Sequence, residues 1–257
     1  MRRTKTPVLK TMLGLRFREQ ESIAVGELAV GASLTLGDAP DAVFRVWRNR
    51  LNIEYEAAAL FRKLAEDLSQ LHGEDDPVVK LCKDAEREEL EHAEMCIEIL
   101  NYSGSETQFS DPKKDVLIGP DEMSLNQQIL YASLAMGCVT ETLSTALLTE
   151  MLNRAEKGLV RDTIHRILKD EVKHSRIGWA ELNRQNQNQD LSWIQPYIPL
   201  MIREALATDI EPMLSQEEGR LELSKWGILS PEDSKQIMNM TIEQVIRPGL
   251  RQFNLAC

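Results

Sequence analysis

Two copies of the pattern Glu-x-x-His are the residues in this sequence best suited to chemistry. The first runs from Glu89 to His92 and the second from Glu171 to His174, in a chain with only four histidines. Residues at i and i+3 of an α-helix lie on one face, so each pair can offer a carboxylate and an imidazole to one metal ion. Carboxylate and imidazole together suit first-row metals such as iron and manganese.

Each Glu-x-x-His pair is preceded by a helical stretch that carries an inward-facing glutamate. Glu54 precedes the first pair and Glu141 precedes the second. Glu56 is the alternative to Glu54, but it shares its helical face with Lys63 and Asp67, whereas Glu54 shares its face with apolar residues. We therefore expect Glu54 to point inward.

Four carboxylates buried together would repel one another and lose their hydration, so cations must compensate. The expected metal ligands are Glu54, Glu89, His92, Glu141, Glu171 and His174. This set predicts two bound iron ions, with manganese or a mixed manganese–iron pair as alternatives. The competing interpretation is that these are solvated charges on acidic helices, with both histidines paired to neighbours.

Helices must position these residues, because strand signals are scarce and apolar residues recur at spacings of three and four. The chain is expected to be all-α, with long helices at about 41–71, 77–102, 124–155 and 159–184. The third should bury one stripe formed by Tyr131, Leu134, Cys138, Glu141, Thr145, Leu148 and Leu152. Residues 103–123 form a long loop, able to cross from one end of a bundle to the other.

The chain should divide into an N-terminal segment, 1–40, with a possible short helix, a four-helix bundle, 41–184, and a helical extension, 185–257, that packs on the bundle. The stretches EYEAAALF, EHAEMC, CVTETLSTAL and DEVKHSRIGWAEL resemble the ferritin-like superfamily of di-iron carboxylate proteins, over about 48–183. These stretches are most similar to those of bacterial ferritin-like domain proteins. This resemblance implies a bundle with a long crossover between helices two and three.

Branches of the superfamily differ beside the third-helix ligand. Rubrerythrins typically add a glutamate where this chain has Ser144, and usually carry a CxxC iron domain that this sequence lacks. Multicomponent monooxygenases often place a threonine there, and Thr145 matches it. Its hydroxyl could relay a proton to dioxygen at the metals, or could bond back to a carbonyl.

A metal-bound histidine usually donates its other N–H to a carboxylate. Asp170 could orient His92 and Glu88 could orient His174, or both acids could be partly exposed. An aspartate before the fourth-helix glutamate resembles this role in the superfamily, whereas Glu88 departs from the usual aspartate. His165 could join the site, although its spacing favours the rim.

These features predict a non-haem di-iron oxidoreductase that activates dioxygen and oxidises a small organic substrate by hydroxylation, N-oxygenation or desaturation, with an external electron donor. One alternative is a ferroxidase, peroxide-scavenging or iron- or manganese-handling protein. Another is a non-catalytic helical interaction protein.

Charge and composition limit the partners. The chain has 257 residues, 42% hydrophobic and 28% charged, with a net charge of −11. The acidic balance argues against nucleic acid, and no apolar run is long enough to cross a membrane. Basic residues interrupt the N-terminal apolar stretch, and the four cysteines form no CxxC pair. We expect a cytoplasmic protein and a possible homodimer.

Overall fold

The computed structural model describes residues 36–103, 119–120, 122–207 and 222–255. The chain divides into two units, Met1–Ser33 and Leu34–Cys257, and the described residues belong to the second. Within these residues every regular element is helical, which confirms the all-α prediction. The short helix expected within 1–40 lies outside them, apart from a 3-10 turn at Leu36–Asp38.

Helices α1 (Asp41–His72) and α2 (Pro77–Leu100) form a hairpin that begins where the sequence predicts. The Asp76 carboxylate accepts hydrogen bonds from the first free N–H groups of α2, those of Val78 at 2.9 Å and Val79 at 3.4 Å. Pro77 has no N–H to leave unsatisfied at the first helical position. Together these residues define the start of α2.

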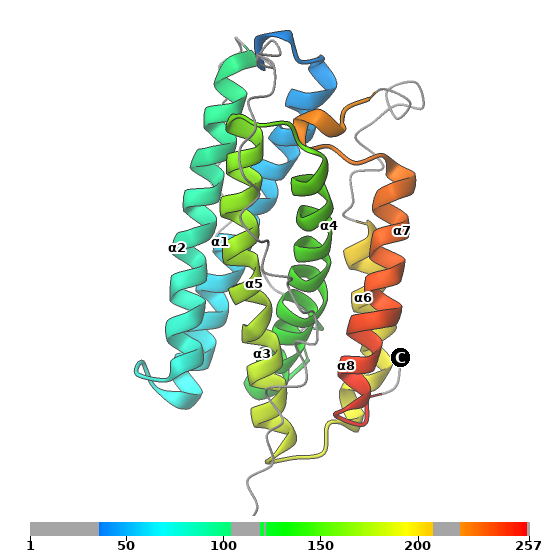
Figure 1. The fold of residues 1–257 in the computed structure, drawn as a ribbon. Coiled ribbons are helices and arrows are strands. Elements are labelled where there is room, and N and C mark those ends of the chain that lie inside the picture. The colour runs from blue at the N-terminus through cyan, green and yellow to red at the C-terminus, as the bar shows by residue number, and fades with distance from the viewer. Residues whose placement is uncertain (1–35, 104–118, 121, 208–221, 256–257) are drawn as a thin grey trace, which may run out of the picture. The chain divides into compact units, whose positions relative to one another are not determined.

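The next helical path consists of α3 (Leu125–Ser133), the π-helical segment η3 (Leu134–Thr140) and α4 (Glu141–Arg154), and α5 (Leu159–Asn186) returns beside it. Figure 1 shows these helices running alongside α1 and α2. Ile129 of α3 packs in one cluster with Val78, at the start of α2, whereas Leu100, at the end of α2, packs with Leu148 of α4. α3 therefore begins at the opposite end of the bundle from the end of α2.

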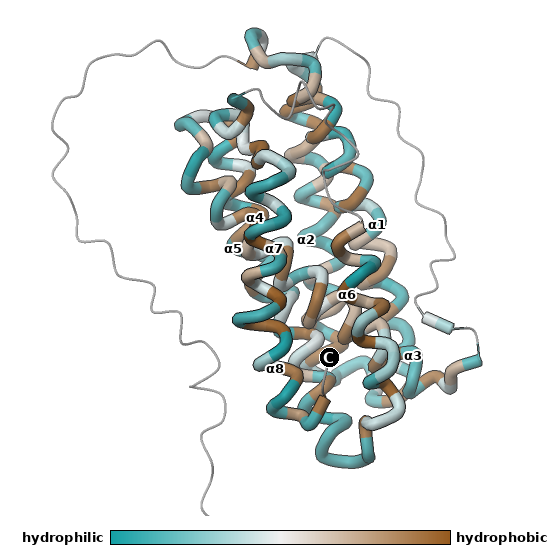
Figure 2. The backbone as a smooth tube through the Cα atoms, turned by 90° about the vertical axis from the view of Figure 1, so that its right-hand side faces the viewer, coloured by the Kyte–Doolittle hydropathy of each residue, from teal (hydrophilic) through white to brown (hydrophobic). Residues whose placement is uncertain are grey.

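The C-terminal region adds short helices that pack against the path from α3 to α4. They are η4 (Ser192–Tyr197), α6 (Ile198–Ala207), η7 (Ser224–Trp226), α7 (Pro231–Thr241), η8 (Ile242–Ile246) and α8 (Arg247–Arg251). Figure 2 looks onto this side, where α6, α7 and α8 alternate hydrophilic and hydrophobic residues. Apolar residues of α6, α7, η8 and α8 join Leu130, Val139 and Leu143 in one buried cluster, whereas Trp226 of η7 packs in another with Leu148.

The stripe expected along 124–155 is buried in its first half, but that half packs in a different cluster from Leu148 and Leu152. Tyr131, Leu134 and Cys138 pack against the C-terminal helices, while Ile129 and Met136 pack against α1, α2 and α5. A π-helical segment takes more residues per turn than an α-helix, so it rotates the side chains that follow it. The rotation occurs in η3, immediately before Glu141.

The helical path and α5 cross with their backbones nearly in contact at two glycines. A Cβ atom placed on Gly178 would lie 2.3 Å from the Ser133 carbonyl oxygen and 2.6 Å from the Cys138 nitrogen. A Cβ atom on Gly137 would lie 2.5 Å from the Gly178 nitrogen. Only glycine allows this approach, which brings α5 and Glu141 to the same interior.

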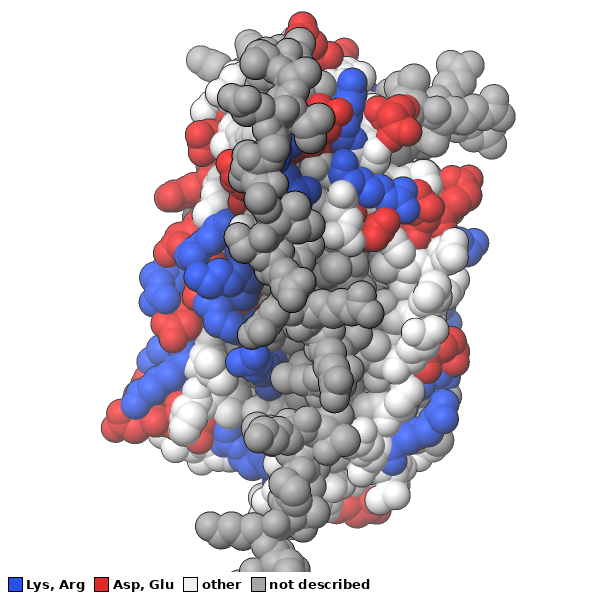
Figure 3. Space-filling view, in the orientation of Figure 1, with Lys and Arg blue, Asp and Glu red and all other residues white. Residues whose placement is uncertain are grey.

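The outer surface carries charges of both signs. Figure 3 shows basic and acidic side chains intermingled on one face. On the α1–α2 hairpin, Lys80 pairs with Asp75 at 3.0 Å and Arg62 pairs with Glu86 at 2.6 Å. Among the described helices, none is long and apolar enough to cross a membrane.

Candidate metal centre

The structure brings all six expected metal ligands into one buried cluster made of two overlapping groups. The His92 group comprises Glu54, Glu89, His92 and Glu171, and the His174 group comprises Glu89, Glu141, Glu171 and His174. In each group, one ligand atom per residue can be chosen so that all four atoms lie within 4.8 Å of one another. Each of the six residues is at most 5% exposed.

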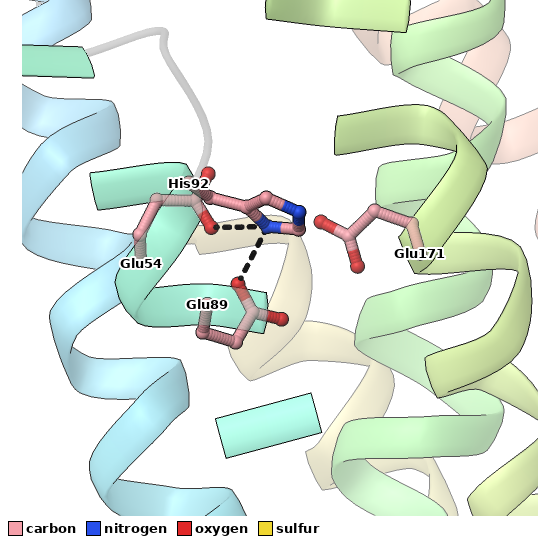
Figure 4. A group of neighbouring side chains, drawn as sticks. All are labelled: Glu54, Glu89, His92 and Glu171. Carbon is pink, nitrogen blue, oxygen red and sulfur yellow. Dashed lines mark hydrogen bonds and ion pairs between the residues drawn. The ribbon is translucent and has the colours of Figure 1, made fainter. Parts of the chain in front are cut away.

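The helices supply these ligands from opposite sides. Figure 4 shows the His92 ring between Glu54 of α1, Glu89 of α2 and Glu171 of α5. Glu89 and Glu171 belong to both groups, so they lie where two metal ions would share ligands. The rings of His92 and His174 are 6.0 Å apart, and Phe61 packs 5.3 Å from the His174 ring.

The His92 imidazole has one nitrogen toward the cluster and the other toward Asp170. Its Nδ1 lies 3.2 Å from Glu89 Oε2 and 3.7 Å from Glu54 Oε2. Its Nε2 lies 3.3 Å from Asp170 Oδ2. Asp170 can therefore accept the Nε2–H and leave Nδ1 free for a metal, which is the arrangement expected for a histidine ligand.

His174 repeats this arrangement on the other side. Its Nδ1 lies 2.8 Å from Glu89 Oε1 and 3.4 Å from Glu171 Oε2. Its Nε2 lies 3.0 Å from Glu88 Oε2. Each histidine is thus held by the acid that precedes the glutamate of the other Glu-x-x-His pair, with Glu88 in the position predicted for it.

The sequence reasoning missed basic residues that contact the site, among them Arg50 and Lys173. The Arg50 guanidinium contacts Glu54 through Nε and donates from Nη2 to Glu171 Oε1 at 3.0 Å. The Lys173 ammonium contacts Glu88 and lies 2.8 Å from Asp170 Oδ1, so it joins the two acids that orient the histidines. Their sequence positions could have indicated both contacts, because Arg50 is one helical turn before Glu54 and Lys173 lies within the second Glu-x-x-His pair.

Other residues considered for the site have different surroundings. Thr145 donates its hydroxyl to the Glu141 carbonyl at 2.8 Å, so the backbone satisfies it. Ser144 contacts the cluster instead, donating to Glu171 Oε1 at 3.2 Å. Glu56 and His165 are exposed on their helices.

Burial and neighbouring charges shift the pKa values of the carboxylates in different directions. Burial raises the pKa of Glu89 to about 7, and the nearby Glu171 and Glu54 charges add to the rise. Burial likewise raises the pKa of Glu141 well above its usual range. Burial opposes ionisation of Glu54 too, but the Arg50 charge outweighs it and lowers the pKa of Glu54 to about 2.

The pKa values of both histidines are also raised, but by neighbouring carboxylates and against the effect of burial. Burial disfavours the charged ring of His92, yet its contacts with Glu54 and Glu89 raise its pKa to about 10. Burial is likewise outweighed at His174, whose contacts with Glu171 and Glu89 raise its pKa to about 12. The cluster therefore attracts positive charge strongly, whether protons or metal ions supply it.

The donor set and its unpaired atoms fit a metal site. Glu171 Oε2 and His174 Nδ1 are buried and make no hydrogen bond to any residue that the structure describes. A buried polar atom without a partner is costly unless a ligand satisfies it. Both atoms point into the same cluster, and their oxygen and nitrogen chemistry is that of first-row metal ligands.

Comparisons of the chain with protein-family models, with curated proteins and with solved structures return no match.

Proposed function

We propose that the chain is a ferritin-like di-iron protein that activates dioxygen and oxidises a small organic substrate. The observation that carries this proposal is the pair of groups that share Glu89 and Glu171 and end in His92 and His174. A glutamate from each of two helices and Glu-x-x-His from each of the other two is the ligand pattern of di-iron and di-manganese bundles.

The residues can be assigned to two metal positions. His92 and Glu54 would bind one ion, and His174 and Glu141 the other, while Glu89 and Glu171 lie close enough to both groups to bridge them. Bound irons would supply the electrons for reducing dioxygen. An external donor would restore those electrons between turnovers.

The protein's own residues hold the ligands and exclude bulk water. Asp170 and Glu88 accept from the outer nitrogens of the two histidines, which fixes both rings with Nδ1 inward. The Ser144 hydroxyl and the Arg50 guanidinium both donate to Glu171 Oε1, which restrains that carboxylate. We do not assign Thr145 a proton-relay role, because its hydroxyl bonds to the backbone.

An anaerobic Fe(II) titration followed by mixing with dioxygen tests the proposal. Wild type should bind two irons per chain and then consume dioxygen rapidly. The double variant Glu89→Ala/Glu171→Ala should lose both properties, because it removes the shared ligands. Glu56→Ala is the matched control, since Glu56 is an exposed glutamate on α1 and should leave both unchanged.

The outcomes separate the alternatives. Oxidation of an organic compound in step with dioxygen consumption, with a reductant present, supports the oxidoreductase proposal. Steady dioxygen consumption with excess Fe(II) alone, and none coupled to an organic compound, would instead assign a ferroxidase or iron-handling role. Absence of stoichiometric iron or manganese in wild type would refute the metal site and leave a helical interaction protein.

A further inference from the structure

Arg50 is a partly buried cation at the edge of a cluster proposed to hold two metal ions. Its side chain is 18% exposed, and its guanidinium contacts Glu54 and donates to Glu171 at 3.0 Å and to Ser144 Oγ at 3.5 Å. These bonds are charge-assisted, and arginine makes them with a rigid planar fork. Arg50 therefore uses ligand oxygens that a metal ion would also use.

The contacts of Arg50 are not distributed evenly between the two groups. Glu54 belongs only to the His92 group, whereas Glu141, its counterpart in the His174 group, has no recorded hydrogen bond with Arg50. In the His92 group, Glu54 is held by Arg50, so this carboxylate is already paired with a cation.

Two buried ligand atoms without a well-aligned hydrogen bond belong to the His174 group, one of them on Glu171, which both groups share. Glu171 Oε2 and His174 Nδ1 are buried and make no well-aligned hydrogen bond to a described residue, although His174 Nδ1 lies 2.8 Å from Glu89 Oε1. They lie 3.4 Å apart and both belong to the His174 group. A metal ion entering this group would satisfy them, without first breaking an arginine–carboxylate bond.

We propose that Arg50 makes the two metal positions unequal. The His174 group binds the first ion tightly, and the His92 group binds the second ion only after Glu54 is released from Arg50. This inference rests on the proposed di-metal function and adds an order of loading to it. Since a hydrogen bond to a charged group contributes about 1.5–3 kcal/mol, the second ion should bind about 10- to 100-fold more weakly.

Anaerobic calorimetric titration with Fe(II) alone measures this difference directly. Wild type should show two separate binding steps, and Arg50→Gln should tighten the second step by about tenfold or more while changing the first much less. Arg50→Lys should lie between them, because it keeps the charge and loses the fork. Arg62→Gln is the matched control, being an exposed arginine on the same helix, and should reproduce wild type.

Ligand variants identify the two steps without using the arginine variants. Glu54→Gln should remove the weak step and keep the tight one, whereas Glu141→Gln should weaken the tight step. Equal affinities in wild type, an unchanged ratio in Arg50→Gln, or loss of the tight step in Glu54→Gln would each overturn the role of Arg50 while leaving a two-metal site intact. No iron binding by wild type would overturn the proposed function itself and this inference with it.

Discussion

Replacing Gly178 by alanine tests the contact that brings α5 to the metal cluster. The added Cβ would lie 2.3 Å from the Ser133 carbonyl oxygen, and real Cβ atoms essentially never approach closer than 3.0 Å. The shortfall is 3.0 − 2.3 = 0.7 Å, so the helices must separate by at least about this distance. The obstructing atoms are mainly backbone, which cannot rotate away as a side chain can.

The magnitude follows from two opposing effects. Overpacking a well-packed interior costs about 1–3 kcal/mol, and backbone contacts place this position near the upper end. Alanine returns about 1 kcal/mol because it favours the helix more than glycine does. The free energy of unfolding of Gly178→Ala should therefore fall by about 2 kcal/mol.

Urea unfolding of the metal-free protein, followed by circular dichroism, measures this change. Gly37→Ala is the control, because a Cβ there meets nothing within 4 Å, and it should stay within about 0.5 kcal/mol of wild type. Gly137→Ala strains the same crossing, so the double variant should lose less stability than the sum of the single variants. If Gly178→Ala were as stable as wild type, the close crossing would be refuted.

Three further predictions concern the helix start, the histidine supports and the metal. Burial opposes ionisation of Asp76, but Arg184 and the N–H groups of α2 outweigh it and lower its pKa below 3.8. Its contribution is therefore present above pH 3.8 and lost as pH falls through the folded-state pKa. Asp76→Ala should lower the unfolding free energy by about 1–3 kcal/mol at pH 7, and urea titrations should show this difference vanishing in acid. Lys173→Met should weaken metal binding about tenfold while Lys173→Arg retains it and the exposed Lys169→Met changes nothing, as measured by metal titration with unfolding as a stability control. Anaerobic Fe(II) at about a thousand times its Kd should stabilise wild type by about 4 kcal/mol in a thermal melt, and Glu171→Gln should abolish the effect.

Much of the architecture follows from local features that a sequence displays. Asp76 and Pro77 define a helix start through one side-chain acceptor and one missing donor, and the structure confirms it. Apolar residues recur at spacings of three and four along α1 and α2, and two of them, Phe61 and Cys82, are 0% exposed. These features can be predicted because a regular helix repeats every 3.6 residues and its geometry does not depend on distant parts of the chain.

The π-helical segment shows where this reading fails. A regular period placed Tyr131 and Leu134 on the same stripe as Glu141, but η3 turns that stripe toward the C-terminal helices. The wider helical turn depends on packing against α5 at Gly178 and against α6, both of which come later in the chain. The helical periodicity of one segment cannot predict contacts with helices that come later in the chain.

The hydrogen-bond partners of the site residues could not be predicted from the sequence either, because they depend on how the helices pack. Thr145 had two open interpretations, and the rotamer that bonds it to the Glu141 carbonyl is a property of the folded helix. Arg50 read as one charge among many on an acidic chain, and only the approach of α5 places its guanidinium beside Glu171.

Residue type and spacing within one helix were enough to predict the helical class, the candidate metal ligands and the helical faces that carry them. Only the tertiary structure shows which candidate ligands lie together, which acid accepts from each histidine and which cation contacts Glu54 and Glu171. Those relations join residues up to 121 positions apart, as Arg50 and Glu171 are. Only packing between helices brings such residues within a few ångströms of one another.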